Sequence, residues 1–401
     1  MTSDNAPNTQ TTTGAKAAGW LNFAGSMVHK LAYRNLFHDR ISLLVTLVGI
    51  VFSVVLVAVQ FGLYIGSERM IAATQDHAQA DLWVVPLGTK SFDDPAFLGG
   101  REKQAVLSTP GVESVEELVV GFASWRKPKG GSTAVLLVGS NATTGSSIPW
   151  NISQGRIEDL SAPSGVAVDT SYFEDLGIAG LGDQAEINNL AVKVTTVTKG
   201  IRSFTTLPYA FTTLPLARTL LDAAPEQATF ALVRLAPDAD ILSVRSELAA
   251  RLTDTEVLTN AEFRKRGLDY WLFQTGAGSA LIAGAVLGII VGIVIVSQTL
   301  YSSTKDHLNE FATLRALGAS ASYIHRVILM QALLSAVIGY LFGMVLSLLV
   351  IWASQDTSLT IVMTPGLALL LFALTIGMCV IAAMSAIFKV TKIDPAVVFS
   401  R

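Results

Sequence analysis

Residues 270–304 read YWLFQTGAGSALIAGAVLGIIVGIVIVSQTLYSST, a run without Asp, Glu, Lys or Arg. About 20 such residues in a helix cross the ~30 Å hydrocarbon core of a bilayer. Three further runs have the same character, at 41–67, 327–355 and 357–388. A soluble helix of this length would alternate polar and apolar faces, and these runs do not. The sequence therefore predicts an α-helical membrane protein with four transmembrane helices.

The composition excludes several other classes of protein. Of the 401 residues, 51% are hydrophobic and 15% charged, against about 25% charged in a typical soluble domain. The net charge of −3 gives no basic excess that would favour nucleic acid as a partner. A single cysteine, Cys379, allows no intrachain disulfide, and five scattered histidines give no metal-ligand spacing.

Basic residues indicate the orientation of the chain. Lys and Arg outnumber Asp and Glu in residues 1–40, in residues 302–326 and in the tail from Lys389. Because basic flanks mark the cytoplasmic side of a membrane, both termini and the 302–326 loop are expected inside. The region between the first two spans has an acidic excess and is expected outside, in the periplasm if the membrane is a bacterial inner membrane.

These observations predict an ordered series of segments along the chain. They are a disordered cytoplasmic lead 1–25, an interfacial elbow helix 26–40, spans 41–67, 270–303, 327–353 and 363–388, a periplasmic domain with stalk 68–269, a cytoplasmic loop 304–326 and a cytoplasmic tail 389–401.

The external domain has an α+β pattern. Segments 81–140 and 227–258 each read as a β-α-β unit, and they flank a β-rich insertion at 141–226. A split pair of β-α-β units is typical of a ferredoxin-like module. A generic α+β domain is the alternative that the pattern leaves open.

Glycines recur at helical spacing inside two of the spans, Gly284, Gly288 and Gly292 in the second and Gly339 and Gly343 in the third. Such spacing lets a neighbouring helix backbone approach closely. The alternative is that glycine is simply frequent in membrane helices. The spacing favours close helix packing but does not say whether the partner helix lies in the same chain or in a second copy.

The loop between the second and third spans reads TKDHLNEFATLRALGAS over residues 304–320. Leu308, Phe311, Ala312 and Leu314 would share one face of a short helix, and Gly318 is a natural C-cap. This amphipathic helix either lies on the membrane surface or docks onto a soluble partner.

The sequence offers no catalytic constellation. The segment GTKS at 88–91 resembles a phosphate-binding loop only faintly, because Thr89 stands where that motif has glycine. We therefore expect no enzyme activity, no nucleotide site and no cofactor in this chain.

Two motifs resemble a known family. EFATLRALGAS at 310–320 is similar to the coupling segment of the macrolide-exporter and lipoprotein-releasing permeases of ABC transporters (the MacB/FtsX superfamily), and KIDPA at 392–396 is similar to its C-terminal signature. The runs at 119–125, 269–271 and 288–298 resemble the DevC-like branch, named for the cyanobacterial heterocyst glycolipid exporter. The resemblance extends over nearly the whole chain from residue 27.

The resemblance implies a permease that works with other proteins. A separate ATPase would bind ATP and Mg, two permease copies would pair, and a periplasmic adaptor and an outer-membrane channel would carry off a lipid, a glycolipid or a hydrophobic small molecule. Carried over by position, the ATPase-coupling residues would be Glu310, Leu314, Arg315 and Gly318, with Asp394 and Pro395 fixing the tail nearby.

Two other functions remain open at this level. One is an FtsX-like mechanotransmitter that regulates a cell-wall hydrolase, although that group typically has a smaller external domain. The other is a haem exporter, with Tyr64, Met70 and His77 as axial ligands near the outer membrane face.

Overall fold

The computed structural model describes residues 29–141, 147–354 and 360–391. It divides into two compact units, one built from the apolar helices and one that contains Leu63–Leu281 and Ala353–Val362. Each unit is considered separately below.

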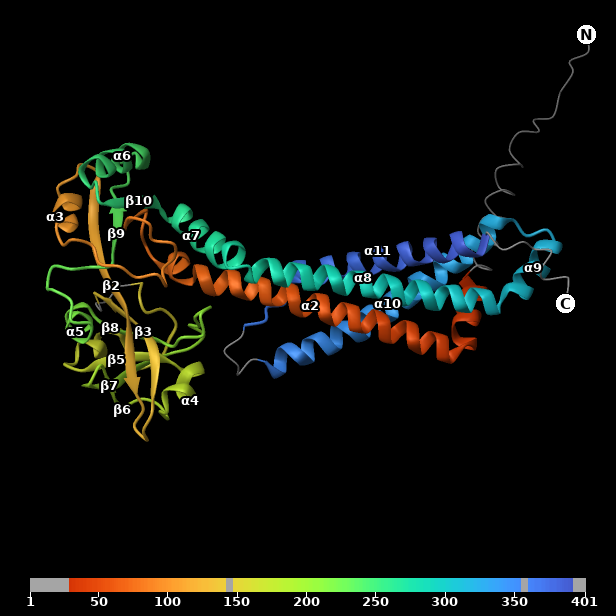
Figure 1. The fold of residues 1–401 in the computed structure, drawn as a ribbon, viewed down its shortest axis with the longest axis horizontal. Helices are drawn as coiled ribbons and strands as arrows, with labels where there is room; N and C mark the ends of the chain where they lie inside the picture. Colours follow the sequence, from red (N-terminus) through yellow and green to blue (C-terminus); the bar gives the residue numbers. More distant parts are fainter. Residues whose placement is uncertain (1–28, 142–146, 355–359, 392–401) are drawn as a thin grey trace, which may run out of the picture. The chain divides into compact units, whose positions relative to one another are not determined.

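Four helices are long and apolar enough to cross a membrane: α2 (Arg40–His77), α8 (Ala277–Asp306), α10 (Ala321–Ala353) and α11 (Pro365–Thr391). They confirm the four predicted transmembrane helices, and they run alongside one another in Figure 1. Residues 29–38 form a further helix ahead of α2, within the predicted elbow. Asp39 separates the two helices, and its Oδ1 accepts the Ser42 N–H at 3.1 Å as a helix cap.

The helical unit buries small and branched apolar side chains from all four helices. Its core includes Ile50 and Val54 of α2, Val296 of α8, Ala336 of α10 and Ala382 of α11. Large apolar side chains also cover its outside, and Ile41, Leu341 and Leu369 are 78%, 58% and 70% exposed. A helix that is apolar all round belongs in a membrane, because lipid solvates the outer face.

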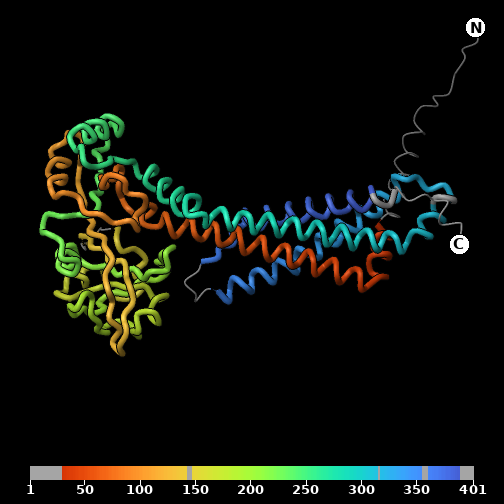
Figure 2. The backbone as a smooth tube through the Cα atoms, in the orientation of Figure 1, coloured from red at the N-terminus to blue at the C-terminus, as the bar shows by residue number. Residues whose placement is uncertain are grey.

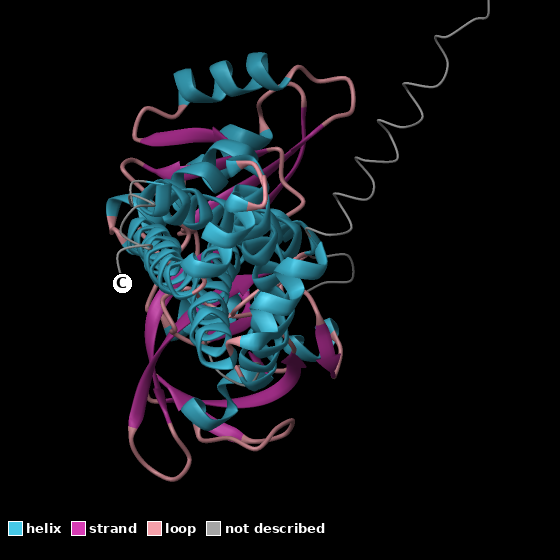
Figure 3. Cartoon of the chain, turned by 90° about the vertical axis from the view of Figure 1, so that its right-hand side faces the viewer, coloured by secondary structure: helices cyan, strands magenta, loops and turns pink. Residues whose placement is uncertain are grey.

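The α/β domain, whose strands are magenta in Figure 3, contains a ferredoxin-like lobe. Its elements are β1 (Leu82–Pro86), α3 (Glu102–Leu107), β2 (Val112–Arg126), β9 (Phe230–Leu235), α6 (Ile241–Arg251) and β10 (Thr255–Thr259). The strands pair antiparallel in the order β10-β1-β9-β2. The two β-α-β units predicted from the sequence thus form one interleaved sheet.

A second, β-rich lobe continues from the same sheet. It contains β3 (Ser132–Ser140), β4 (Ile152–Gln154), β5 (Gly165–Asp169), β6 (Gln184–Ile187), β7 (Leu190–Thr198) and β8 (Tyr209–Thr213), with helices η1 (Ile157–Ser161), η2 (Thr170–Tyr172), α4 (Phe173–Leu176) and α5 (Leu214–Leu220). The strands follow the order β2-β3-β8-β5-β7-β4, and β6 pairs with β2 and β7.

The boundary between the lobes lies inside β2, which differs from the sequence prediction. The prediction assigned all of 81–140 to the first lobe. In the structure β2 pairs with β9 up to Leu118 and with β3 from Val119 onward. One 15-residue strand therefore serves both lobes, and its sequence contains no turn signal at the change of partner.

A stalk connects the domain to the helices. The outer part of α2 lies beside α7 (Asn260–Leu268), which continues through the π-helix η3 (Asp269–Gln274) into α8. Arg264 of α7 pairs with Asp76 at 2.9 Å and Glu68 at 3.4 Å on α2. Figure 2 shows α2 as one continuous helix.

A buried carboxyl group gives the domain a pH-dependent stability. Tyr209 Oη donates to Asp93 Oδ1 at 2.8 Å, but burial outweighs this bond and raises the pKa of Asp93 to about 6 from 3.8. Because the folded pKa lies above the unfolded one, the protonated acid is favoured in the fold. The contribution of Asp93 to stability is therefore fully present below about pH 4 and is lost as the pH rises through 6.

We expect Asp93→Asn to stabilise the domain at pH 7.5 by about 2–3 kcal/mol, because the uncharged amide removes this cost while its oxygen still accepts from Tyr209. The difference from wild type should vanish below about pH 4. Thermal unfolding of the full chain in detergent, followed by tryptophan fluorescence from pH 4 to 8, measures it. An equal gain at pH 4 and pH 7.5 would contradict the titration of Asp93.

Candidate functional site: a short helix between two spans and a glycine seam

The loop between α8 and α10 contains α9 (Leu308–Ala316), labelled in Figure 1. Phe311 is buried in the core of the helical unit, and Leu314 packs against that core. On the other side Asn309, Glu310 and Thr313 are exposed. The helix is therefore amphipathic, as its sequence predicts, with its apolar face held by the bundle and a polar face left outside.

Both ends of α9 are fixed by local hydrogen bonds. His307 Nδ1 lies 3.2 Å from Glu310 Oε2, and the Phe311 N–H donates to the His307 carbonyl at 3.1 Å. At the other end Gly318 has φ +99°, and the Ala319 N–H donates to the Leu314 carbonyl at 2.9 Å. This is a Schellman end with glycine at the left-handed position, which confirms the predicted cap.

Leu317, directly before that glycine, is 80% exposed and projects from the end of the loop. The sequence analysis did not single it out, because it lies off the apolar face of α9. The sequence does contain a signal for its exposure, because Leu317 is an apolar residue directly before a C-cap glycine.

The structure places Glu310, Leu314 and Gly318 together on α9 and its end. The backbone of Arg315 belongs to the same helix, whereas its side chain lies outside the described part of the chain. Asp394 and Pro395 also lie outside the described residues.

The glycines of α8 face α2. A Cβ added at Gly284 would lie 2.6 Å from Gln60 Nε2, and one at Gly288 would lie 3.1 Å from Leu56 Cδ2. At Gly292 it would overlap Ser53 of α2 and Met378 of α11. Ser53 Oγ also donates a hydrogen bond to the Gly288 carbonyl. Only glycine lets the two backbones approach this closely.

The glycines of α10 face the same helix from another side. A Cβ at Gly339 would lie 2.5 Å from Ile50 Cγ2, and one at Gly343 would lie 2.8 Å from Val54 Cβ. The question left open by the sequence is thus answered for these positions, since the partner helix belongs to the same chain. We call these contacts of α8 and α10 with α2 the glycine seam.

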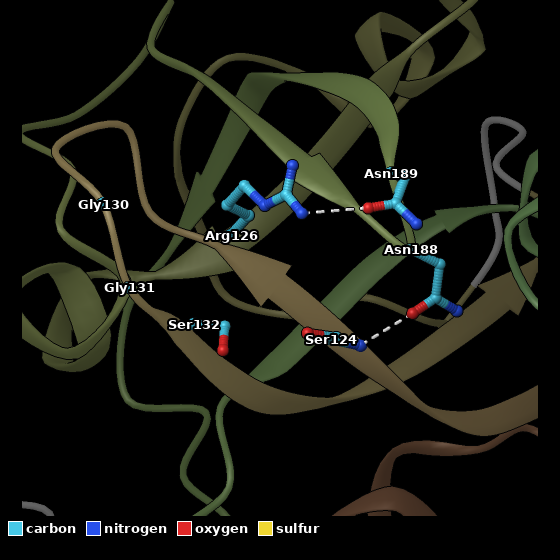
Figure 4. Close-up of a pocket in the computed structure, with 7 residues that line it drawn as sticks. All are labelled: Ser124, Arg126, Gly130, Gly131, Ser132, Asn188 and Asn189. Carbon is cyan, nitrogen blue, oxygen red and sulfur yellow. Dashed lines mark hydrogen bonds between the residues drawn. The ribbon is translucent and has the colours of Figure 1, made fainter.

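The β-rich lobe has an open polar basin of about 530 Å³ at the β2–β3 turn, shown in Figure 4. Arg126 donates to Asn189 Oδ1 at 3.1 Å and pairs with Glu186 at 2.8 Å. Asn188 Oδ1 accepts the Ser124 N–H at 2.9 Å. The groups that line the basin bond mainly to one another, and this pattern is typical of a stabilised turn.

Two of the three residues considered for haem, His77 and Met70, are placed against other groups or buried. The His77 ring stacks on Trp150 with centroids 4.4 Å apart, and its Nδ1 lies 2.7 Å from the Ala73 carbonyl. Met70 is 9% exposed, in the core of the stalk. Within the described ranges, no group of three or more His, Cys, Asp and Glu is placed to hold a metal ion.

Comparison with protein families gives two matches. Residues 43–251, just over half of the chain, match the model of the MacB-like periplasmic core domain. Residues 282–395 match the model of the FtsX-like permease C-terminal domain. Together they cover most of the apolar helices and most of the α/β domain, but neither includes α7 or η3 of the stalk.

Relatives with a curated description are similar over a shorter length. Uncharacterized ABC transporter permeases of Mycobacterium tuberculosis and Mycobacterium bovis are 31% identical over 123 residues, which are 31% of this chain and 34% of each relative. The match thus spans about a third of the length of these relatives.

Two solved structures are similar to part of this chain. The extracellular domain of the noncanonic ABC-type transporter YknZ from Gram-positive bacteria is 18% identical, with a TM-score of 0.34 over 45% of this chain and 99% of that one. The periplasmic region of MacB from Actinobacillus actinomycetemcomitans is 12% identical, with a TM-score of 0.37 over 49% and 96%. On its family matches, the chain belongs to the MacB/FtsX-type ABC transporter permeases and is a multi-pass membrane protein.

Proposed function

We propose that this chain is the permease subunit of an ABC exporter in which a separate ATPase drives motion of the α/β domain. The domain would lie in the periplasm and both termini in the cytoplasm of a bacterial inner membrane. Family membership implies the ATPase partner. The cargo would be a lipid, a glycolipid or a hydrophobic small molecule, passed to an adaptor and an outer-membrane channel.

The arrangement of α9 carries this proposal. Its apolar face is anchored by Phe311 in the bundle core, while Glu310 and Leu317 remain outside, with Leu317 80% exposed. A protein interface usually has an apolar centre surrounded by a polar rim. The exposed Leu317 and the polar side chains of α9 match this pattern. A push on α9 would reach α8 and α10, since α9 is joined to both.

The glycine seam supports transmission of that push. The glycines let α8 and α10 contact α2 closely. Because the contact is tightly packed, a displacement of one helix would push directly on the backbone and branched side chains of the next. The helix α2 then runs without a break from the bundle to His77 in the stalk. We expect ATP and Mg to bind the ATPase subunit, a second permease copy to complete the assembly, and this chain to hold no cofactor.

The test is purification of a tagged full-length copy from its own host in mild detergent, with co-purifying proteins identified by mass spectrometry. We expect an ABC ATPase and a periplasmic adaptor. An ATPase together with a cell-wall hydrolase would contradict efflux and favour the FtsX-like mechanotransmitter. A haem absorbance band would favour the haem exporter. Intact permease without any ATPase, even after crosslinking, would contradict the proposal.

A further inference from the structure

The segment between β7 and β8, residues 199–206, leaves the β-rich lobe and contacts the stalk; we call it the strap. The Phe204 ring packs against Trp271 of η3, with centroids 5.4 Å apart and planes at 60°. Arg202 Nη1 donates to Thr360 Oγ1 at 3.4 Å. Two strap residues of the lobe thus reach two segments that lead into apolar helices, α8 and α11.

The base of the strap is held firmly by its own lobe. The Ile201 N–H donates to Asp169 Oδ2, and the Ser203 N–H donates to Tyr172 Oη, each at 2.8 Å. Asp169 and Tyr172 are fully buried, and Thr198 Oγ1 also donates to Asp169 Oδ2 at 3.0 Å. Hydrogen bonds from alternate backbone N–H groups to buried side chains hold the strap in one conformation. A displacement of the stalk would therefore be passed on to the lobe and would not be lost in bending of the strap.

The residues that the strap contacts lie in segments that lead into the spans. Trp271 lies in the π-helix that joins α7 to α8, and such helices recur at functional positions. Thr360 precedes α11, and its carbonyl lies against Gly66 of α2 so closely that a Cβ at this glycine would overlap it. The strap therefore contacts the segments that precede α8 and α11, and it reaches Gly66 of α2 through Thr360.

The lobe has a second attachment at the end of α2. Trp150 stacks on His77 with ring planes 9° apart. Two separate attachments restrict the rotation of the lobe about β2 more than either would alone.

From these contacts we infer that the strap binds the β-rich lobe to the membrane-connected segments, with Arg202 and Phe204 as positioning residues, so that the lobe moves with the stalk as one body. The functional meaning of this coupling rests on the proposed function, because an ATPase must supply the motion. The attachment itself can be tested without any partner.

The test uses pulsed electron paramagnetic resonance on the full chain in detergent. Cys379 is replaced by Ala, and spin labels are placed at Arg69→Cys on the stalk and Lys129→Cys at the turn of the β-rich lobe, both exposed. We expect one narrow distance distribution. The double variant with Arg202→Gln and Phe204→Ala should give a broad distance distribution. An unchanged distribution in that variant would overturn the inference.

Two further variants separate loss of the strap from general damage. Arg202→Lys with Phe204→Tyr keeps the charge and the ring, and should keep the narrow distribution. Arg101→Gln with Phe122→Ala removes an exposed arginine and a 55% exposed phenylalanine elsewhere in the domain, and should have no effect. A broad distribution in this control would also overturn the assignment to the strap.

A final measurement connects the strap to the ATPase cycle. In the complex with its ATPase, the distance between labels 69 and 129 should stay the same after trapping with ATP and vanadate, because the lobe follows the stalk. A shift would overturn the single-body inference. Failure of the ATPase to co-purify would contradict the proposed function and leave the partner-free measurement as the test of the strap.

Discussion

Replacing Leu317 by aspartate is expected to abolish ATPase capture and stimulated ATP hydrolysis while the permease stays folded in the membrane. Leu317 is 80% exposed, so the change removes almost no internal packing. If the leucine is the apolar anchor of the interface, its loss costs about 2 kcal/mol or more, which is about 30-fold in affinity, and a buried charge adds to this cost. Co-purification of the ATPase and its hydrolysis rate measure the effect.

A matched control for this variant is Leu87→Asp. Leu87 is 72% exposed and follows β1 in the α/β domain, so it tests the same chemical change outside the α9 loop. We expect normal ATPase capture from this control. Capture of the ATPase by Leu317→Asp at the wild-type level would contradict the docking role of the loop.

Substitutions at Gly318 extend the same test to the backbone. A Cβ at Gly318 meets no atom within 4 Å, and its φ is +99°, so conformation alone selects glycine. Gly318→Asn should keep much of the coupling, since asparagine tolerates the left-handed region. Gly318→Pro, with φ locked near −65°, should lose it. Equal coupling in both variants would show that the Schellman end is not needed.

The sequence predicts those parts of the fold that depend on a short, repeated pattern. Charge-free runs identify the four apolar helices because hydrocarbon tolerates almost no charge. The burial of Phe311 and Leu314 follows from helical spacing, and the cap at Gly318 from its place after that helix. Each of these features is decided by residues that are neighbours in the sequence.

Features that depend on long-range contacts escaped the sequence analysis. The change of partner within β2 depends on β9, which lies more than 100 residues further along the chain and pairs with β2 up to Leu118, and on the hairpin with β3. The strap is similar, since Phe204 has no local signal that it packs against Trp271. The glycine spacing predicted close packing, but only the structure identifies α2 as the partner.

Gly339→Ala is expected to destabilise the helical unit and to weaken coupling even where the ATPase still binds. The new Cβ would lie 2.5 Å from Ile50 Cγ2 and 2.8 Å from Ile50 Cβ. Cβ atoms are not flexible side-chain ends, so α10 must move away from α2. Overpacking of this kind typically costs about 1–3 kcal/mol. Thermal unfolding in detergent measures the stability, and the hydrolysis rate of the complex measures the coupling.

Two other glycines provide a graded comparison within the same bundle. Gly288→Ala brings its Cβ to 3.1 Å from the flexible end of Leu56, so a small shift accommodates it, and Gly377→Ala meets nothing within 4 Å. The loss should therefore be large at Gly339, small at Gly288 and absent at Gly377. Adding Ile50→Ala to Gly339→Ala removes the Cγ2 contact and should restore part of the coupling. Helix propensity alone would stabilise all three variants, because Gly-to-Ala favours a helix at each position. Equal losses at all three glycines would therefore contradict the role of the seam.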